Sequence, residues 1–164
     1  MLTLKATKNH SHNLSKASTA SHVSPETLNE VLKFHKSIGN KSTPLVDLSG
    51  LASDLGVQSV FIKDESKRLG LNAFKGLGAS YAIHKQLEKN PNIEVFCTAT
   101  DGNHGKAVAW MAKKLQKKAV IFMPKGTVSD RVASIEDEGA EVHVIDGGYD
   151  DAVKKARDKV DSFK

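Results

Sequence analysis

The sequence contains few residues of several types, and each shortage excludes a class of protein. Cys97 is the only cysteine among 164 residues, which excludes an internal disulfide and a metal site built from several cysteines. A lone cysteine is typical of a reducing compartment, so a cytoplasmic location is expected. No apolar run approaches the ~20 residues that span a bilayer, so an integral membrane protein is not expected.

The sequence also lacks a strong excess of charge. It has 24 Lys and Arg residues against 19 Asp and Glu residues, a formal net charge of +5, and the acids are interleaved with the bases after residue 26. A nucleic-acid-binding protein usually concentrates its bases on one face, so neither nucleic acid nor a membrane surface is an expected partner. With 39% apolar and 26% charged residues, the composition predicts an ordinary soluble globular chain rather than a disordered or collagen-like one.

Residues 1–23 contain no acidic residue and no arginine. A transit peptide carries arginine and an amphipathic apolar face, so the segment is interpreted as a mobile N-terminal extension. His10 and His12 are two residues apart and could hold a metal ion in a strand. A solvated tail is the favoured interpretation, and no metal site is predicted.

Beyond this extension the pattern predicts alternating helices and strands. Ser24-Pro25-Glu26 indicates a helix start, because serine caps, proline suits the first position and an acid suits the first turn. Gly39 marks the end of that helix. The other elements expected are an extended piece at 43–46, a helix at 48–55 closed by Gly56, a strand at 57–63, a helix from about Lys75 to Leu87, strands at 95–100, 119–123 and 141–145, and helices at 104–117, 127–139 (capped by Thr127 or Ser129) and 149–164.

This alternation predicts an α/β fold, an open parallel sheet with flanking helices on both faces. About three strands are few for a self-sufficient fold of this type. The last helix also reaches Lys164 without a glycine, asparagine or proline stop. We therefore expect the chain to be a portion of a longer protein.

The first candidate site is the segment from Gly70 to Ala79, which leads from a strand into a helix. Lys75 is expected in the first turn of that helix, flanked by Phe74 and small residues. The positive end of the helix dipole and an apolar setting both favour the neutral amine, which can attack a carbonyl to form a Schiff base. The alternative is an ordinary solvated surface lysine.

The second candidate site is the Thr100-Asp101-Gly102-Asn103-His104-Gly105 segment, between a strand and the next helix. Backbone N–H groups at such a helix start bind oxyanions, and glycine allows a ligand to approach closely. Asn103 could bind a ring oxygen, and Asp101 could act as a general base. The alternative is an Asx turn with a helix cap, and His104 alone suits capping or packing better than metal binding.

Other motifs are absent or incomplete. There is no GxxxxGK[ST] and no HExxH, and Gly76 and Gly78 lack the third glycine of a dinucleotide fingerprint. The NAFKG motif around Lys75 and the TDGNHG motif around Asn103, however, together resemble those of the tryptophan-synthase-β-like pyridoxal-phosphate enzymes of fold type II. The motifs depart from the usual superfamily pattern at three positions, Ala73, Thr100 and Asp101. With these departures, they are most similar to the motifs of the diaminopropionate ammonia-lyases. The resemblance covers about residues 25–164.

This resemblance implies a cofactor, pyridoxal 5'-phosphate, and a role for each matching residue. Lys75 would form the Schiff base with the cofactor and later act as a base. Asn103 would bind the pyridine 3'-oxygen, with Gly102 and His104 shaping its loop, and Phe74 would pack beside the ring. Asp101 would be a second base that also attracts the second ammonium of 2,3-diaminopropionate, which is converted to pyruvate and ammonia.

The resemblance also implies how the whole protein is organised. Residues 24–89 would form the first part of a large domain, residues 90–164 most of a small domain, and the full-length protein a homodimer. The phosphate-binding loop and the pyridine-nitrogen partner of this superfamily lie further downstream, so the isolated chain is expected to bind the cofactor weakly. The alternatives are a serine/threonine dehydratase of the same superfamily or a non-catalytic α/β module.

Overall fold

The computed structural model describes residues 24–162. The chain divides into two compact units, Met1–Asp64 and Glu65–Lys164, and each is described here by itself. The expected N-terminal extension, with His10 and His12, lies outside the described residues. No helix within residues 24–162 is long and apolar enough to cross a membrane.

The first unit begins with helix α2 (Pro25–Ser37), and its start confirms the sequence prediction. The Ser24 hydroxyl accepts a hydrogen bond from the Thr27 N–H at 3.2 Å, and Pro25 occupies the first helical position. This bond satisfies one of the amide groups that a helix start leaves without a partner. Gly39 follows the helix with φ +85°, a left-handed conformation that glycine adopts without strain.

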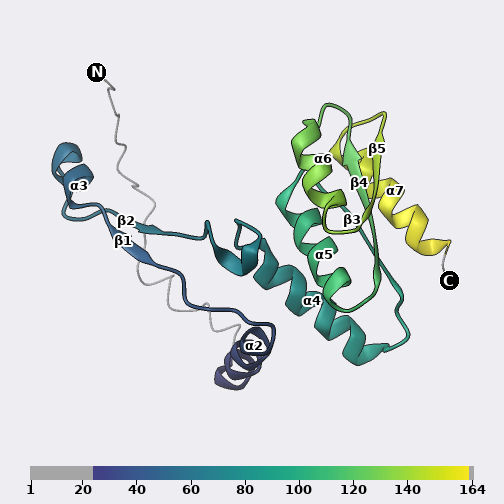
Figure 1. Ribbon diagram of the computed structural model, residues 1–164, viewed down its shortest axis with the longest axis horizontal. Helices are drawn as coiled ribbons and strands as arrows, with labels where there is room; N and C mark the ends of the chain where they lie inside the picture. Colours follow the sequence, from purple (N-terminus) through teal and green to yellow (C-terminus); the bar gives the residue numbers. More distant parts are fainter. Residues whose placement is uncertain (1–23, 163–164) are drawn as a thin grey trace. The chain divides into compact units, whose positions relative to one another are not determined.

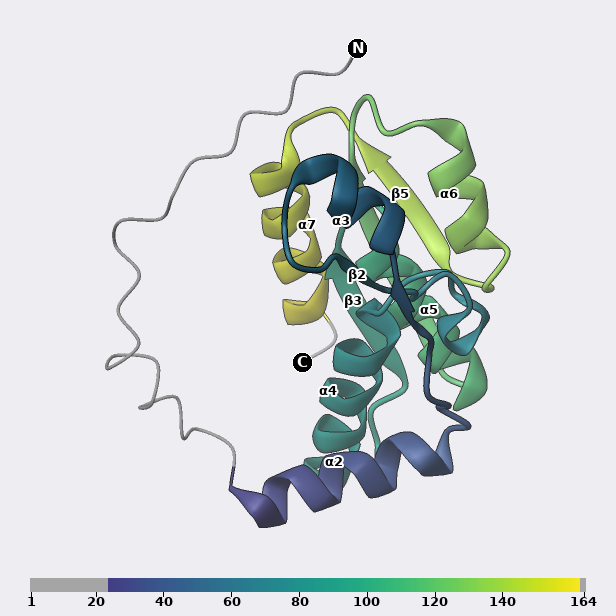
Figure 2. The ribbon, with the colours of Figure 1, turned by 90° about the vertical axis from the view of Figure 1, so that its left-hand side faces the viewer.

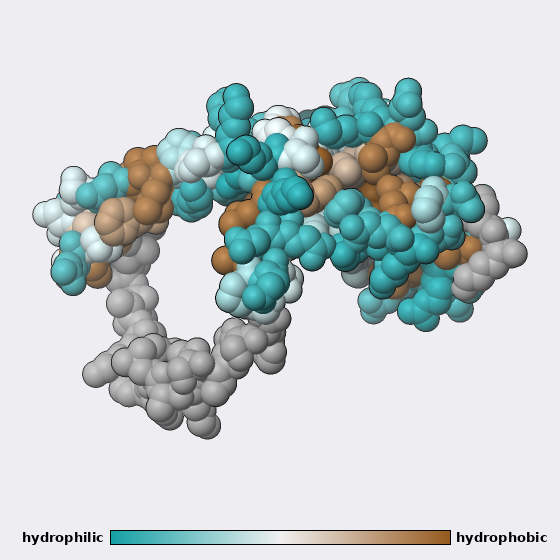
Figure 3. All heavy atoms as spheres, turned by 90° about the horizontal axis from the view of Figure 1, so that it is seen from below, coloured by the Kyte–Doolittle hydropathy of each residue, from teal (hydrophilic) through white to brown (hydrophobic). Residues whose placement is uncertain are grey.

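The same unit contains two short antiparallel strands, β1 (Leu45–Asp47) and β2 (Phe61–Lys63), with helix α3 (Ser49–Leu55) between them. The sequence predicted both extended segments and the closing Gly56 but not their pairing. The second strand was also expected to begin at Val57 and begins at Phe61. Figure 3 shows apolar surface over this part of the chain, and Leu45, Phe61 and Ile62 are among its exposed residues.

The second unit is built on a parallel sheet in the order β3 (Val95–Ala99), β4 (Lys118–Pro124) and β5 (Glu141–Ile145). The central strand is buried along almost its whole length, as expected for a strand covered on both faces. The predicted α/β fold with a parallel sheet is therefore confirmed. The structure differs in adding the separate antiparallel pair of the first unit.

Four helices accompany this sheet: α4 (Lys75–Lys89), α5 (Asn103–Lys114), α6 (Ser129–Glu136) and α7 (Tyr149–Asp161). Figures 1 and 2 show α5 and α6 on one face of the sheet and α7 on the other, and α4 packs against α5. Because side chains of a strand alternate between its faces, β4 supplies both cores. The core beneath α7 contains Ala99, Val120, Phe122, Ala152 and Ala156.

Two local predictions in this unit are wrong. Helix α6 has no side-chain cap: Val128 precedes it, the Thr127 hydroxyl donates to the Pro124 carbonyl at 2.9 Å, and the Ser129 hydroxyl contacts Asp130. Helix α5 ends at Lys114 rather than near 117, because Gln116 adopts a left-handed conformation with φ +56°. A helix cannot continue through that conformation.

Candidate functional site

A cavity of about 570 Å3 lies in the second unit, at the carboxyl ends of the parallel strands. Ligand sites of open α/β sheets are found at this edge, where the loops that follow the strands converge. The sequence analysis gives a catalytic or cofactor-binding role to six residues. Five of them line the cavity: Lys75, Asp101, Gly102, Asn103 and His104. The structure therefore brings together two motifs that are separated along the chain.

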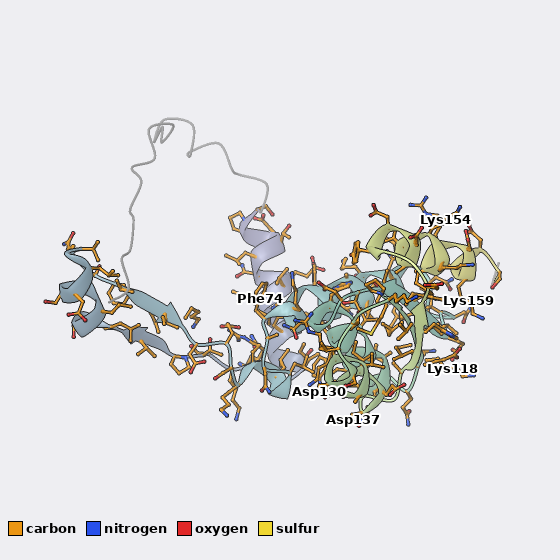
Figure 4. All side chains as sticks on the ribbon, turned by 90° about the horizontal axis from the view of Figure 1, so that it is seen from above. Phe74, Lys118, Asp130, Asp137, Lys154 and Lys159 are labelled. Carbon is orange, nitrogen blue, oxygen red and sulfur yellow. The ribbon has the colours of Figure 1, made fainter. Side chains whose placement is uncertain are left out.

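Lys75 is the first residue of α4, as the sequence predicted, and its side chain is exposed. Residues 24–162 leave its amine exposed rather than in the apolar setting that the sequence predicts. Phe74 precedes it, with 57% of its surface exposed and its ring centroid 5.1 Å from the Lys75 Nζ (Figure 4). Phe74 is thus adjacent to the amine but is not among the residues that line the cavity.

The segment that leads into α4 has an unusual backbone. Leu69, Gly70 and Asn72 all have positive φ values of 52°, 75° and 58°. Such conformations are strained for residues with a side chain, least so for asparagine, and they concentrate at functional sites. Before them, the buried Arg68 guanidinium forms two hydrogen bonds to Glu65, at 2.6 and 2.7 Å. This ion pair joins two residues that are close in the sequence, just before the left-handed segment.

The loop before α5 is organised by the Thr100 side chain, which is almost fully buried. Its hydroxyl accepts hydrogen bonds from the Gly102 N–H at 3.0 Å and the Gly105 N–H at 3.1 Å, and is 3.3 Å from the Gly102 carbonyl. The residue before α5 is Gly102, which has no side chain, and the Thr100 hydroxyl rather than an Asx side chain satisfies the Gly105 N–H in the first turn of the helix. The turn is made by a threonine hydroxyl instead.

Gly105 permits the close approach of α5 to this loop. A Cβ atom at position 105 would lie 2.3 Å from the Thr100 Cγ2 and 3.0 Å from the Ile121 Cγ2. Real Cβ contacts are not this short, so only glycine fits between the loop and the central strand. The glycine that ends the TDGNHG motif is therefore explained by packing.

Electrostatics couple the two segments. Desolvation of the imidazole lowers the pKa of His104, and the positive charge of Lys75 lowers it further. The neutral imidazole is thereby favoured at neutral pH, with one nitrogen as donor and the other as acceptor. Within residues 24–162, no group of three or more His, Cys, Asp or Glu side chains is arranged to hold a metal ion.

The cavity is also lined by Thr100, which belongs to the second candidate segment, and by two residues that the sequence does not assign to the site, Arg131 and Tyr149. Arg131 lies in the first turn of α6, and its Nη1 donates to the Asp101 carbonyl at 3.0 Å. Tyr149 is the first residue of α7. A usable signal was present, because each follows a predicted parallel strand and so lies at the edge where the Asp101 loop also lies.

This arrangement suits an aldehyde cofactor that carries acceptor groups. The Lys75 amine can condense with a carbonyl, the Asn103 amide can bind a ring oxygen, and the N–H groups at the start of α5 can bind an anion. A cavity of about 570 Å3 is also of a size that holds a small cofactor. The fold, and a lysine at the cavity, are features expected of an α/β enzyme that holds an aldehyde cofactor on a lysine.

Comparison with known proteins identifies the family. The sequence model of the family described as "Pyridoxal-phosphate dependent enzyme" matches residues 36–163. This is well over half of the chain, and the chain belongs to this family of pyridoxal-phosphate-dependent enzymes.

Individual relatives are more specific. The chain is 48% identical to the diaminopropionate ammonia-lyase of Salmonella typhimurium, over 77% of this chain and 37% of that protein. It is 36% identical to the L-threonine dehydratase of Pasteurella multocida, over 73% of this chain and 23% of that protein. The solved Escherichia coli diaminopropionate ammonia-lyase with an aminoacrylate–PLP azomethine intermediate has a TM-score of 0.82 at 42% identity, covering 88% of this chain and 41% of that chain. The chain thus spans little more than a third of the length of the ammonia-lyases it matches.

Proposed function

We propose that the protein containing this chain is a pyridoxal-phosphate-dependent ammonia-lyase that converts 2,3-diaminopropionate to pyruvate and ammonia. The observation that carries the proposal is the presence of the Lys75 amine and the Asp101 carboxylate in one cavity. The 48% identity to a diaminopropionate ammonia-lyase supports this substrate.

The chain's own residues have distinct roles in this proposal. Lys75 would hold the cofactor covalently through its Nζ, and Asn103 would donate a hydrogen bond to the ring oxygen. The bound cofactor supplies an electron sink for the α-carbon of the substrate. Once its Nζ is released, Lys75 can accept the proton from that carbon. Gly102 and His104 would shape the loop, and Phe74 would pack beside the ring.

Asp101 would determine the preference for a diamino acid. Its carboxylate attracts a second ammonium group, which 2,3-diaminopropionate has and serine or threonine lacks. The Asp101 carboxylate can also act as a second base in addition to Lys75, on the opposite face of the substrate. A serine/threonine dehydratase is the alternative function, and the 36% identity to an L-threonine dehydratase supports it. A non-catalytic α/β module is the alternative for the isolated chain.

The organisation of the whole protein is part of the proposal. Residues 24–89 would begin a large domain and residues 90–164 would form most of a small one, within a cytoplasmic homodimer. The boundary between the two compact units of this chain falls between Asp64 and Glu65, a different position from the proposed domain boundary after residue 89. The cofactor phosphate and the pyridine nitrogen would be bound by residues outside this chain.

The first experiment tests cofactor attachment. The purified chain is incubated with pyridoxal phosphate and reduced with borohydride, and the modified lysine is identified by peptide mass. We expect the label to fall selectively on Lys75, to be absent in Lys75→Ala and to be retained in Lys89→Ala, a matched change at the other end of α4. Labelling scattered over surface lysines, or none, would contradict a working cofactor site in the isolated chain and would restrict the proposed function to the full-length protein.

The second experiment tests the substrate. Pyruvate release is measured with 2,3-diaminopropionate, serine and threonine, for the full-length protein and for its Asp101→Asn variant. We expect the diamino acid to be preferred, and the substitution to lower its turnover by about 100-fold or more, as the loss of a general base does. Preference for serine or threonine would favour the dehydratase instead.

A further inference from the structure

We propose that Arg131 is a positioning residue that places the Asp101 side chain at the cavity by holding the peptide group between Asp101 and Gly102. The inference rests on the proposed function for its catalytic consequence. Its structural part stands on distances in the second unit alone.

The peptide between Asp101 and Gly102 is held at both ends. Its carbonyl accepts a hydrogen bond from the Arg131 Nη1 at 3.0 Å, and its N–H donates to the Thr100 hydroxyl at 3.0 Å. The two partners come from different elements, one from α6 and the other from the end of β3. The Arg131 side chain also lies along Gly102, with its Cδ 3.5 Å from where a Cβ would be.

This peptide needs an external restraint. Because residue 102 is a glycine, rotation of the preceding peptide meets little steric resistance. The Asp101 side chain is exposed, and its carboxylate has no hydrogen-bond or ion-pair partner within residues 24–162. The held peptide therefore fixes the position of the Asp101 Cα and Cβ atoms, from which the carboxylate turns about its own torsions, and Arg131 holds the carbonyl end of that peptide.

Arg131 is suited to this role and is not used elsewhere. Within residues 24–162, the one hydrogen bond of its guanidinium goes to the Asp101 carbonyl, and the guanidinium forms no ion pair there with an acidic side chain. A guanidinium fixed by a hydrogen bond and by packing loses little freedom when a ligand enters. The Arg131 guanidinium donates to the Asp101 loop and not to Lys75, which lies on α4. A substitution of Arg131 can therefore change proton transfer by Asp101 without changing cofactor attachment at Lys75.

The two anchors predict separable effects on hydrogen exchange. The Gly102 and Gly105 N–H groups share the Thr100 hydroxyl as acceptor, but only Gly102 belongs to the peptide that Arg131 holds. Removing the guanidinium should therefore free Gly102 while Gly105 keeps its protection. The Gly105 amide is an internal control for the folding of the loop.

The test compares the unmodified chain with Arg131→Gln, Arg131→Lys and Lys125→Gln. Lys125 lies just before α6, pairs with Asp146 and is outside the cavity, so its substitution removes a charge without touching the loop. By NMR, we expect Arg131→Gln to raise the exchange rate of the Gly102 amide by about tenfold, with Gly105 unchanged. Arg131→Lys should retain most of the protection, and Lys125→Gln all of it. Equal acceleration of both glycine amides, or of neither, would overturn the proposal.

The catalytic consequence is measured separately. Arg131→Gln should lower kcat for 2,3-diaminopropionate by about 10- to 100-fold with little change in KM. It should leave the borohydride-trapped adduct at Lys75 within about twofold of the unmodified chain, since Lys75 lies on another helix. A double variant tests whether Arg131 acts through Asp101. On an Asp101→Asn background, the Arg131→Gln substitution should have no further effect on kcat. An additive lowering of kcat in the double variant would show that Arg131 acts other than through Asp101. If the full-length protein releases no pyruvate from 2,3-diaminopropionate, the proposed function fails while the exchange experiment still decides the role of Arg131.

Discussion

The two segments that bring functional side chains to the cavity are held in place by different means. The segment before Lys75 depends on left-handed backbone conformations and on the Glu65–Arg68 pair, three residues apart. The Asp101 loop depends on side chains, above all the Thr100 hydroxyl and the guanidinium of Arg131, thirty residues away. Substitutions should therefore affect the first through backbone conformation and the second through packing and hydrogen bonding.

The largest expected effect is on the packing of the second segment. Gly105→Ala should destabilise the fold by about 2–4 kcal/mol, because the new methyl group would overlap Thr100 and Ile121. The free energy of unfolding in urea measures this. Gly78→Ala, in α4 with open space around its Cα, is the control and should stabilise by about 0.5–1 kcal/mol. Similar values for the two variants would show that the close approach at Gly105 is unimportant.

The next largest effect concerns the threonine hydroxyl. Thr100→Val keeps the shape of the side chain but leaves the N–H groups of Gly102 and Gly105 without their acceptor, one of them in a buried bond. We expect a loss of about 1–3 kcal/mol in urea unfolding. Thr100→Ser keeps the hydroxyl and should preserve slow exchange of both glycine amides. Fast exchange in the serine variant would assign the protection to packing instead.

A smaller effect should distinguish the first segment. Asn72 has φ +58° and an exposed side chain, so Asn72→Ala should cost about 1 kcal/mol and Asn72→Gly close to nothing. Thermal unfolding of the two variants provides the comparison. If alanine and glycine are equally tolerated, the left-handed backbone does not hold this segment, and the contrast between the two segments disappears.

The smallest expected effect is on the pKa of His104, which lies in the Asp101 loop and responds to the charge of Lys75 in the other segment. His104 has a lowered pKa in the folded chain, so it binds its proton more weakly than in the unfolded chain. Its contribution to stability is present above the unfolded pKa of about 6.5 and is lost as the pH falls through the lower folded pKa. NMR titration should show the His104 pKa rising in Lys75→Met, but only in part, because desolvation is the larger cause.

The control for this titration is Lys89→Met, at the far end of α4. It should leave the His104 pKa where it is in the unmodified chain. Equal shifts in the two methionine variants would mean that His104 responds to net charge rather than to its neighbour Lys75.

Much of the fold could be predicted because its signals are local. Ser24 and Pro25 mark a helix start, Gly56 and Gly139 adopt left-handed conformations after helices, and the predicted strand at 141–145 matches β5 residue for residue. The errors arose where tertiary contacts prevail over local propensity. The Thr127 hydroxyl bonds to the Pro124 carbonyl rather than capping α6, and the pairing of β1 with β2 joins segments that no turn signal connects.

The candidate site was predictable to the extent that its residues stand in motifs. Lys75 and Asp101 could be found because each belongs to a glycine-containing segment just before a helix. Arg131 and Tyr149 could not be found in this way, because each stands alone at a helix start and gains its position from the order of the strands. Knowing that parallel strands direct successive helix starts to one edge would have added both.

The parallel sheet has a consequence for how enzymes of this kind diversify. The strand residues form the buried core of the sheet, whereas the residues that follow the strands line the cavity. Asp101, Arg131 and Tyr149 belong to this second set. A substitution at the first turn of a helix changes the residues presented to a ligand while the layers beneath remain as they were. One substrate can therefore be exchanged for another at this edge at little cost to folding, in keeping with the likeness of this chain to both an ammonia-lyase and a dehydratase.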